Sequence, residues 1–93
     1  MLTWDDFLAF CDLTEGEVEA IAAHEGVPKI IAAQLGHYLI HSPGGEARIR
    51  AMILDDIAFA RARNDAEQVA EFEAILRRFD ELHGGRSASA ALH

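Results

Sequence analysis

The sequence predicts an all-α fold, a compact bundle of four to five helices whose last two form a long antiparallel hairpin. Two observations predict it. Apolar residues recur at helical spacing through most of the 93 residues, and residues typical of helix ends separate these stretches. The alternating β-branched pattern of strands does not occur, and there are only three valines. With 51% hydrophobic residues, the chain is long enough for one small domain and too short for two.

Each helix is predicted from its ends. Thr3 and Thr14 precede acidic residues and suit the caps of the first two helices, with Glu17 at the spacing of a capping box. Gly26 terminates the second helix, and Pro28 suits the first turn of the third. The expected helices are a short one after Thr3 and then residues 14–25, 28–41, 46–63 and 65–83, with a turn at SPGG, residues 42–45.

Residues 1–83 therefore form a single helical domain in this prediction. The remaining ten residues, GGRSASAALH, are small and polar and follow the last apolar position. We expect residues 84–93 to be a flexible C-terminal tail, because nothing in them can anchor the chain to a core.

The apolar stripes of the three long helices predict the core. In the third helix the stripe is Ile30, Ile31, Leu35, Tyr38 and Leu39; in the fourth it is Ile49, Met52, Ile53, Ile57 and Ala60; in the fifth it is Val69, Phe72, Ile75, Leu76, Phe79 and Leu82. In the first helix, Cys11 shares its apolar face with Trp4, Phe7 and Leu8 and is expected to be an inert core residue.

Several large apolar residues exceed what so small a core needs. Phe10, Ile40 and Phe59 lie at the edges of the stripes or off them. Apolar surface beyond the core usually contacts a partner, and a second copy of the chain is the commonest partner. The leading interpretation is therefore a small helical binding protein that self-associates as a homo-oligomer, and not an enzyme.

The net charge and the cysteine content indicate which partners and which cellular compartment to expect. A net charge of −8 disfavours binding to nucleic acid or to an anionic membrane and favours a soluble protein or a basic partner. The single cysteine allows no internal disulfide, and the acidic N-terminus does not look like a secretory signal. We expect a cytoplasmic protein.

A metal or haem site is the alternative interpretation. His37 and His41 are four residues apart, so both imidazoles lie on one side of a helix, a spacing that metal sites use. His24 and Asp56 could join them, with Glu17 and Glu25 as further oxygen ligands. Imidazole with carboxylate suits iron or zinc, and a haem would also use histidine. The other possibility is that both histidines pack at the edge of the core and bind no metal.

Asp56 is a carboxylate that falls inside an apolar stripe, between Ile49, Met52 and Ala60. A buried carboxylate requires a cation or hydrogen-bond donors. Arg63 lies two helical turns further along nearly the same line, and Arg48 and Arg50 are alternatives. The simplest expectation is a buried ion pair, and metal ligation is the alternative.

A helix-turn-helix regulator is the third interpretation. Residues 14–41 form helix, turn and helix, with Ala22, Gly26 and Val27 at suitable positions. The second of these helices offers Lys29 and Gln34 but no arginine, so DNA recognition has little chemical support.

Overall fold

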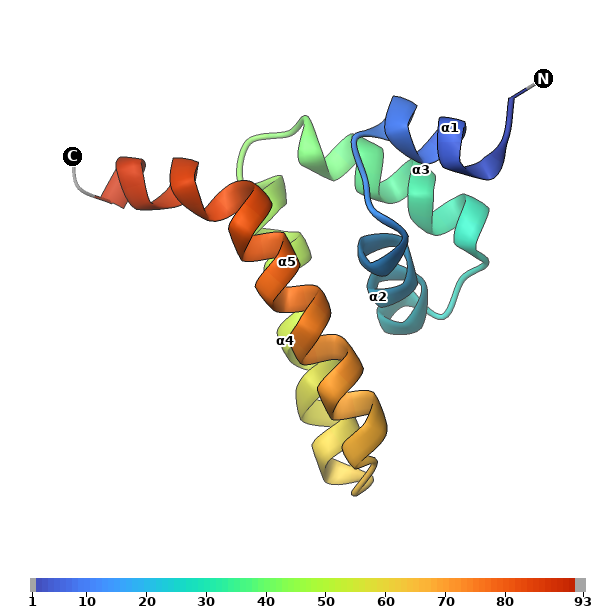
Figure 1. Cartoon of the computed structure of the whole chain (residues 1–93), viewed down its shortest axis with the longest axis vertical. Coiled ribbons are helices and arrows are strands. Elements are labelled where there is room, and N and C mark those ends of the chain that lie inside the picture. The colour runs from blue at the N-terminus through green and yellow to red at the C-terminus, as the bar shows by residue number, and fades with distance from the viewer. Residues whose placement is uncertain (1, 92–93) are drawn as a thin grey trace.

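The computed structural model describes the backbone of residues 2–91 and the side chains of residues 2–83. Within that part every regular element is an α-helix, so the predicted all-α class is confirmed (Figure 1). The helices are α1 (Trp4–Cys11), α2 (Glu15–Glu25), α3 (Lys29–Ile40), α4 (Gly45–Ala62) and α5 (Ala66–Ala91).

The first two helices begin at the predicted threonine caps. The Thr3 hydroxyl accepts a hydrogen bond from the Asp6 amide at 3.1 Å, and the Thr14 hydroxyl accepts one from the Glu17 amide at 3.2 Å. Both caps are complete capping boxes, since the acidic side chain accepts a hydrogen bond from the threonine amide in return. α2 ends at Gly26, whose φ of 67° lies in the left-handed region.

The helices fall into two groups, which meet where α2 and α3 pack against α4 and where α2 packs against α5. α4 and α5 lie side by side along most of their lengths and are linked by a short turn (Figure 1). α2 packs against α3, α4 and α5, and α1 packs on α3. α2 therefore connects the N-terminal helices to the long α4–α5 pair.

α4 supplies the centre of the core. All five residues of its predicted stripe are buried, and Ile49, Ile53 and Ala60 are completely so. The stripe of α5 is only partly confirmed: Phe72 and Phe79 are buried, whereas Leu82 is exposed. Leu82 lies near the C-terminal end of the described side chains.

The predicted core face of α3 is only partly correct: Leu39 is buried and Leu35 packs against the core as expected, but the other three residues of the stripe do not. The buried residues of this helix are Ala32, Ala33, Gly36 and Leu39, whereas Ile30, Ile31 and Tyr38 are exposed. Close packing explains the difference, because a Cβ atom on Gly36 would lie only 2.9 Å from side-chain atoms of Ile21 and Leu13. The small residues let α3 approach α2 closely, and the large ones are left on the outside.

α5 continues to Ala91, beyond its expected end near His83. The flexible tail expected at residues 84–93 falls where the side chains lie outside the described part, and it stays a prediction. Within the described part of the chain, no helix combines the length and apolar character needed to cross a membrane.

Candidate functional site

The four predicted metal ligands lie in two different places. His37 and His41 are at the end of α3, next to the C-terminus of α1. His37 Nδ1 donates to the Cys11 carbonyl at 3.3 Å, and His41 Nε2 lies 3.3 Å from an oxygen of Asp12. The two rings meet edge to face, with 4.7 Å between their centroids. One nitrogen of each ring thus already has a protein partner, and the two partners differ.

His24 and Asp56 lie in the second place, where the end of α2 faces the middle of α4. His24 Nδ1 lies 2.8 Å from Glu25, and its Nε2 lies 3.1 Å from Asp55. Burial lowers the pKa of His24, but the hydrogen bonds to these two carboxylates outweigh burial and raise that pKa above its ordinary value. The contact of His24 with Asp55 therefore joins α2 to α4.

Asp56 is buried, as predicted, with 8% of its surface exposed. Neither Arg63 nor Arg50 pairs with Asp56, because Arg63 donates to Gln68 and Arg50 to Asp80 instead. Among the described residues, the Asp56 Oδ2 atom has no hydrogen-bond partner. Burial raises the pKa of Asp56 to about 6, while the charge of His24 opposes this rise and that of Asp55 adds to it.

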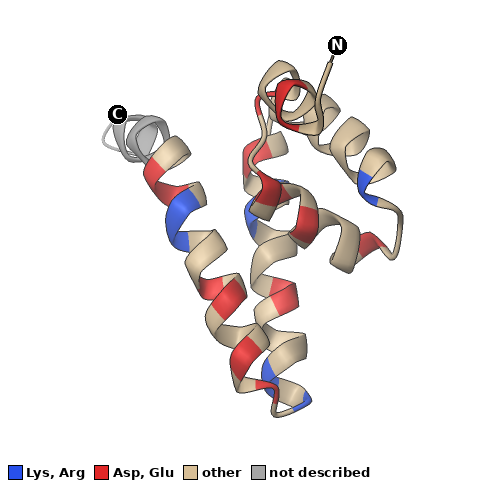
Figure 2. Cartoon of the chain, turned by 45° about the vertical axis from the view of Figure 1, so that its right-hand side comes forward, with Lys and Arg blue, Asp and Glu red and all other residues tan. Residues whose placement is uncertain are grey.

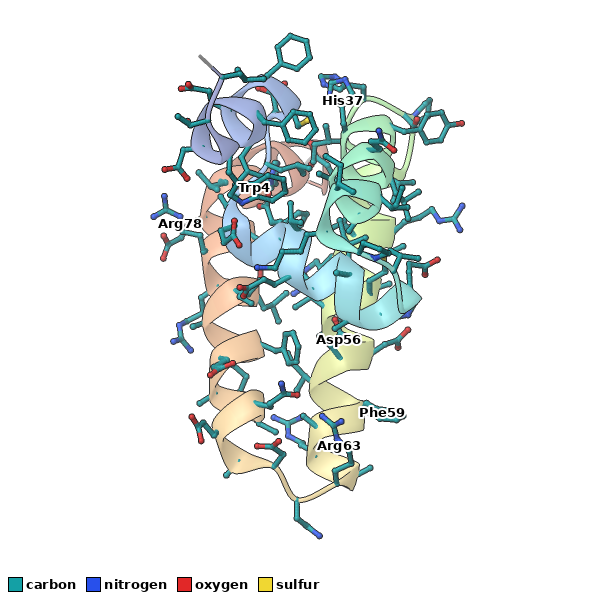
Figure 3. All side chains as sticks on the ribbon, turned by 90° about the vertical axis from the view of Figure 1, so that its right-hand side faces the viewer. Trp4, His37, Asp56, Phe59, Arg63 and Arg78 are labelled. Atoms are coloured by element: carbon teal, nitrogen blue, oxygen red, sulfur yellow. The ribbon has the colours of Figure 1, made fainter. Side chains whose placement is uncertain are left out.

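Asp56 lines an open cavity of about 520 Å³ between α2, α4 and α5. Figure 3 shows Asp56, Phe59 and Arg63 following one another along the same side of α4. The Arg63 guanidinium lies 5.0 Å from the centre of the Phe59 ring. The full lining is Ala23, His24, Asp55, Asp56, Phe59, Arg63, Gln68 and Phe72.

Glu17 and Glu25 do not join either place as ligands for the histidines of α3. Glu25 is exposed and contacts His24, although the helical pattern put it on the apolar side. Glu17 is 1% exposed and serves the cap of α2. Its Oε2 lies 3.6 Å from His83, which also lies 3.6 Å from Glu46.

This cluster of Glu17, His83 and Glu46 was missed from the sequence, because His83 was assigned to the end of the last helix without a role. Its three members come from α2, α5 and α4, so only tertiary packing brings them together. The available signal was the capping box, which fixes Glu17 at the start of a helix that must itself be packed.

No three His, Cys, Asp or Glu side chains in the described part of the chain converge as they would around a metal ion. The pairing of His37 with His41 and the placing of His24 beside Asp56 are therefore two separate arrangements. Each offers two groups, and a stable metal site in a helical bundle usually has three or four protein ligands.

The outer face of α3 is the third notable surface. It consists of Ile30, Ile31, Gln34 and Tyr38, all exposed, and Tyr38 is 68% so. No Asp, Glu, Lys or Arg occurs between Lys29 and Glu46, although the chain carries 16 acidic residues. Figure 2 shows this contrast: α3 has a single basic position at its start, whereas acidic positions mark the other helices.

Phe10 adds to the apolar surface near α3. It is 76% exposed, and its ring stacks on His37 with 6.2 Å between centroids. Phe59 is exposed as the pattern indicated, but Ile40 is partly buried against the core. Lys29, the only basic residue of α3, contacts Glu15 of α2 at 2.9 Å.

Comparison with known protein families, with curated proteins and with solved structures finds no significant match for this chain.

Proposed function

We propose that this protein is a cytoplasmic helical binding protein that self-associates, and that the outer face of α3 is its contact with a second copy. One observation carries the proposal: α3 buries its small residues and exposes Ile30, Ile31 and Tyr38. A helix at the surface of a domain normally buries its large apolar side chains and exposes polar ones.

The energetic reason is the cost of leaving large apolar side chains in water. Burying a side chain such as isoleucine contributes roughly 1.5–3 kcal/mol. Two isoleucines and a tyrosine on one face therefore represent a substantial free energy that only a covering partner can recover. A small domain has a further reason to associate, since its own core is limited.

Charge favours a second copy as the partner. Two copies of a chain with a net charge of −8 repel each other through most of their surfaces. The outer face of α3 is the place where they can meet without opposing carboxylates, because it contains no acidic residue. A partner of opposite charge would gain more from the acidic helices than from this face.

A two-fold contact between two α3 helices fits the spacing of the residues. Ile30, Gln34 and Tyr38 are four apart and so follow one line along the helix. With the axis at Gln34, the two amides face each other and can exchange hydrogen bonds, and each Tyr38 covers the isoleucines of the other copy. Such an interface is self-complementary, as two-fold symmetry requires.

We also propose that α4 and α5 form a long antiparallel hairpin, against which α3 packs through α4. Two ion pairs support that direction. Arg50, early in α4, pairs with Asp80 at 2.9 Å, and Arg61, late in α4, pairs with Glu73 at 2.8 Å. The later residue of α4 thus meets the earlier residue of α5.

Tyr38→Glu tests the proposal by placing a carboxylate within the contact, against the isoleucines of the other copy. Sedimentation equilibrium should give a dimer for the native chain and a dissociation constant at least about tenfold higher for the variant, corresponding to about 1.4 kcal/mol or more. Circular dichroism should show unchanged helix content, since Tyr38 is exposed.

Leu82→Glu is the matched control. It adds the same charge at an exposed leucine of α5, away from α3, and should leave the dimer intact. A native chain that stays monomeric at millimolar concentration, or equal effects of the two variants, would contradict the proposal.

A further inference from the structure

The cavity between α2, α4 and α5 has the size and the chemistry of a small-molecule site. Its volume of about 520 Å³ lies in the range of roughly 300–1,000 Å³ common for such pockets. Its walls combine two phenylalanines with a small number of charged and amide groups. It does not involve the outer face of α3.

The surroundings of Asp56 suggest that the cavity binds a ligand. More than nine tenths of this residue is buried, it lines the cavity, and its Oδ2 atom has no hydrogen-bond partner among the described residues. A buried carboxylate without a cation is costly, and neither Arg50 nor Arg61 pairs with it, since they bind Asp80 and Glu73. A ligand that places N–H donors against this carboxylate would compensate its charge.

Arg63 supplies the opposite charge in the same cavity. Its Nη2 donates to Gln68 at 2.8 Å, and its guanidinium is held over Phe59. A guanidinium has five donors, so most of them stay available to an anionic group. Phe59 is three residues after Asp56, which is about 4.5 Å along the helix axis.

The lining carries charges of both signs. Asp55 and Asp56 provide carboxylates and Arg63 provides a cation, while the imidazole of His24 is already held by Asp55 and Glu25. A simple cation would be attracted by one end and repelled by the other. A ligand that carries both charges, with no net charge, is complementary to both ends.

We propose that this cavity binds the zwitterion of an amino acid with an apolar side chain. The ammonium group donates to the Asp56 carboxylate, and the ligand's carboxylate accepts from the free donors of Arg63. The apolar side chain lies against Phe59 and Phe72. Both contacts are charge-assisted hydrogen bonds, the stronger class.

Isothermal titration calorimetry with three probes tests the proposal on the full chain. L-Phenylalanine carries both charges, phenethylamine lacks the carboxylate, and 3-phenylpropionate lacks the ammonium group. L-Phenylalanine should bind, and each of the other two should bind at least about tenfold more weakly, since each loses one charge-assisted contact.

Two variants and a control assign the contacts. Asp56→Asn should abolish measurable binding of L-phenylalanine, and Arg63→Gln should weaken it at least about tenfold. Glu81→Gln removes an exposed carboxylate of α5 outside the cavity and should leave binding unchanged. Circular dichroism on each variant separates lost binding from lost folding.

Three results would overturn the proposal. L-Phenylalanine at millimolar concentration could give no heat and no chemical-shift change, phenethylamine could bind as tightly as L-phenylalanine, or folded Asp56→Asn could bind normally. The second result would identify a plain cation site. None of them bears on the dimer, whose contact lies on α3.

Discussion

At the scale of single residues, Asp56 links stability to pH. Its pKa is about 6 in the folded protein, above the ordinary value of 3.8. The folded state therefore binds this proton more tightly than the unfolded state does. The contribution is fully favourable below pH 3.8, and it is lost as the pH rises through 6 and the buried carboxylate ionises.

Asp56→Asn should therefore stabilise the protein at neutral pH. The neutral amide avoids burying a charge, so the free energy of unfolding should rise by about 1–3 kcal/mol at pH 7.5. At pH 3.5 the aspartate is protonated in both states, and the two chains should differ little. Urea denaturation of both chains at each pH measures this difference.

Asp80→Asn provides the comparison, because Asp80 is a more exposed carboxylate paired with Arg50. Its loss should not stabilise the protein at either pH. If Asp56→Asn changes the free energy of unfolding equally at both values, the buried charge is not the cause.

At the scale of the elements, the turn before α4 depends on two adjacent glycines with different requirements. A Cβ on Gly45 would lie 1.5 Å from the Leu39 carbonyl oxygen, so the backbone of α3 would have to move. Gly44 has open space around it, but its φ of 75° is left-handed. The first requirement is close packing, and the second is local conformation.

Gly45→Ala should therefore destabilise the protein far more than Gly44→Ala. We expect a loss of about 3 kcal/mol or more for the steric clash. For the left-handed alanine we expect about 1–2 kcal/mol. Thermal and urea denaturation of the two variants give the comparison, and equal losses would show that α3 and α4 do not meet so closely at this turn.

At the scale of the whole molecule, the net charge of −8 opposes self-association. Salt screens this repulsion, because the Debye length falls from roughly 10 Å at 0.1 M to about 3 Å at 1 M. The proposed contact through α3 is apolar, so added salt does not weaken any ion pair within it. The proposed dimer should therefore tighten as salt increases.

Sedimentation equilibrium at 0.05 M and 0.5 M sodium chloride tests this expectation. The dissociation constant should fall by roughly threefold to tenfold at the higher concentration. A dimer that dissociates on adding salt would indicate that opposite charges, and not the outer face of α3, hold the copies together.

Much of the fold could be predicted from the sequence because its signals are local. Thr3, Thr14 and Gly26 mark helix ends through hydrogen bonds and backbone angles within a few residues. The stripe of α4 is buried as predicted, since apolar residues at helical spacing must lie on one face. The burial of Asp56 followed from the same pattern.

The candidate sites were less predictable because they depend on which face of each helix meets a neighbour. A pattern shows that Asp56 shares a face with Ile53, but not that Arg63 turns to Gln68 on another helix. The cluster of Glu17 with His83 joins residues far apart in the chain. Long side chains choose partners in three dimensions, and sequence spacing constrains only those on the same helix.

The sequence alone therefore determined the helical class, the capped ends of α1 and α2 and the buried stripe of α4. Only the tertiary structure decided that α3 buries Ala32, Ala33 and Gly36 and leaves Ile30, Ile31 and Tyr38 outside. The physical reason is that α3 is apolar on nearly every side, so its hydrophobic pattern selects no face. The close approach of α2, which only small residues permit, selects it instead.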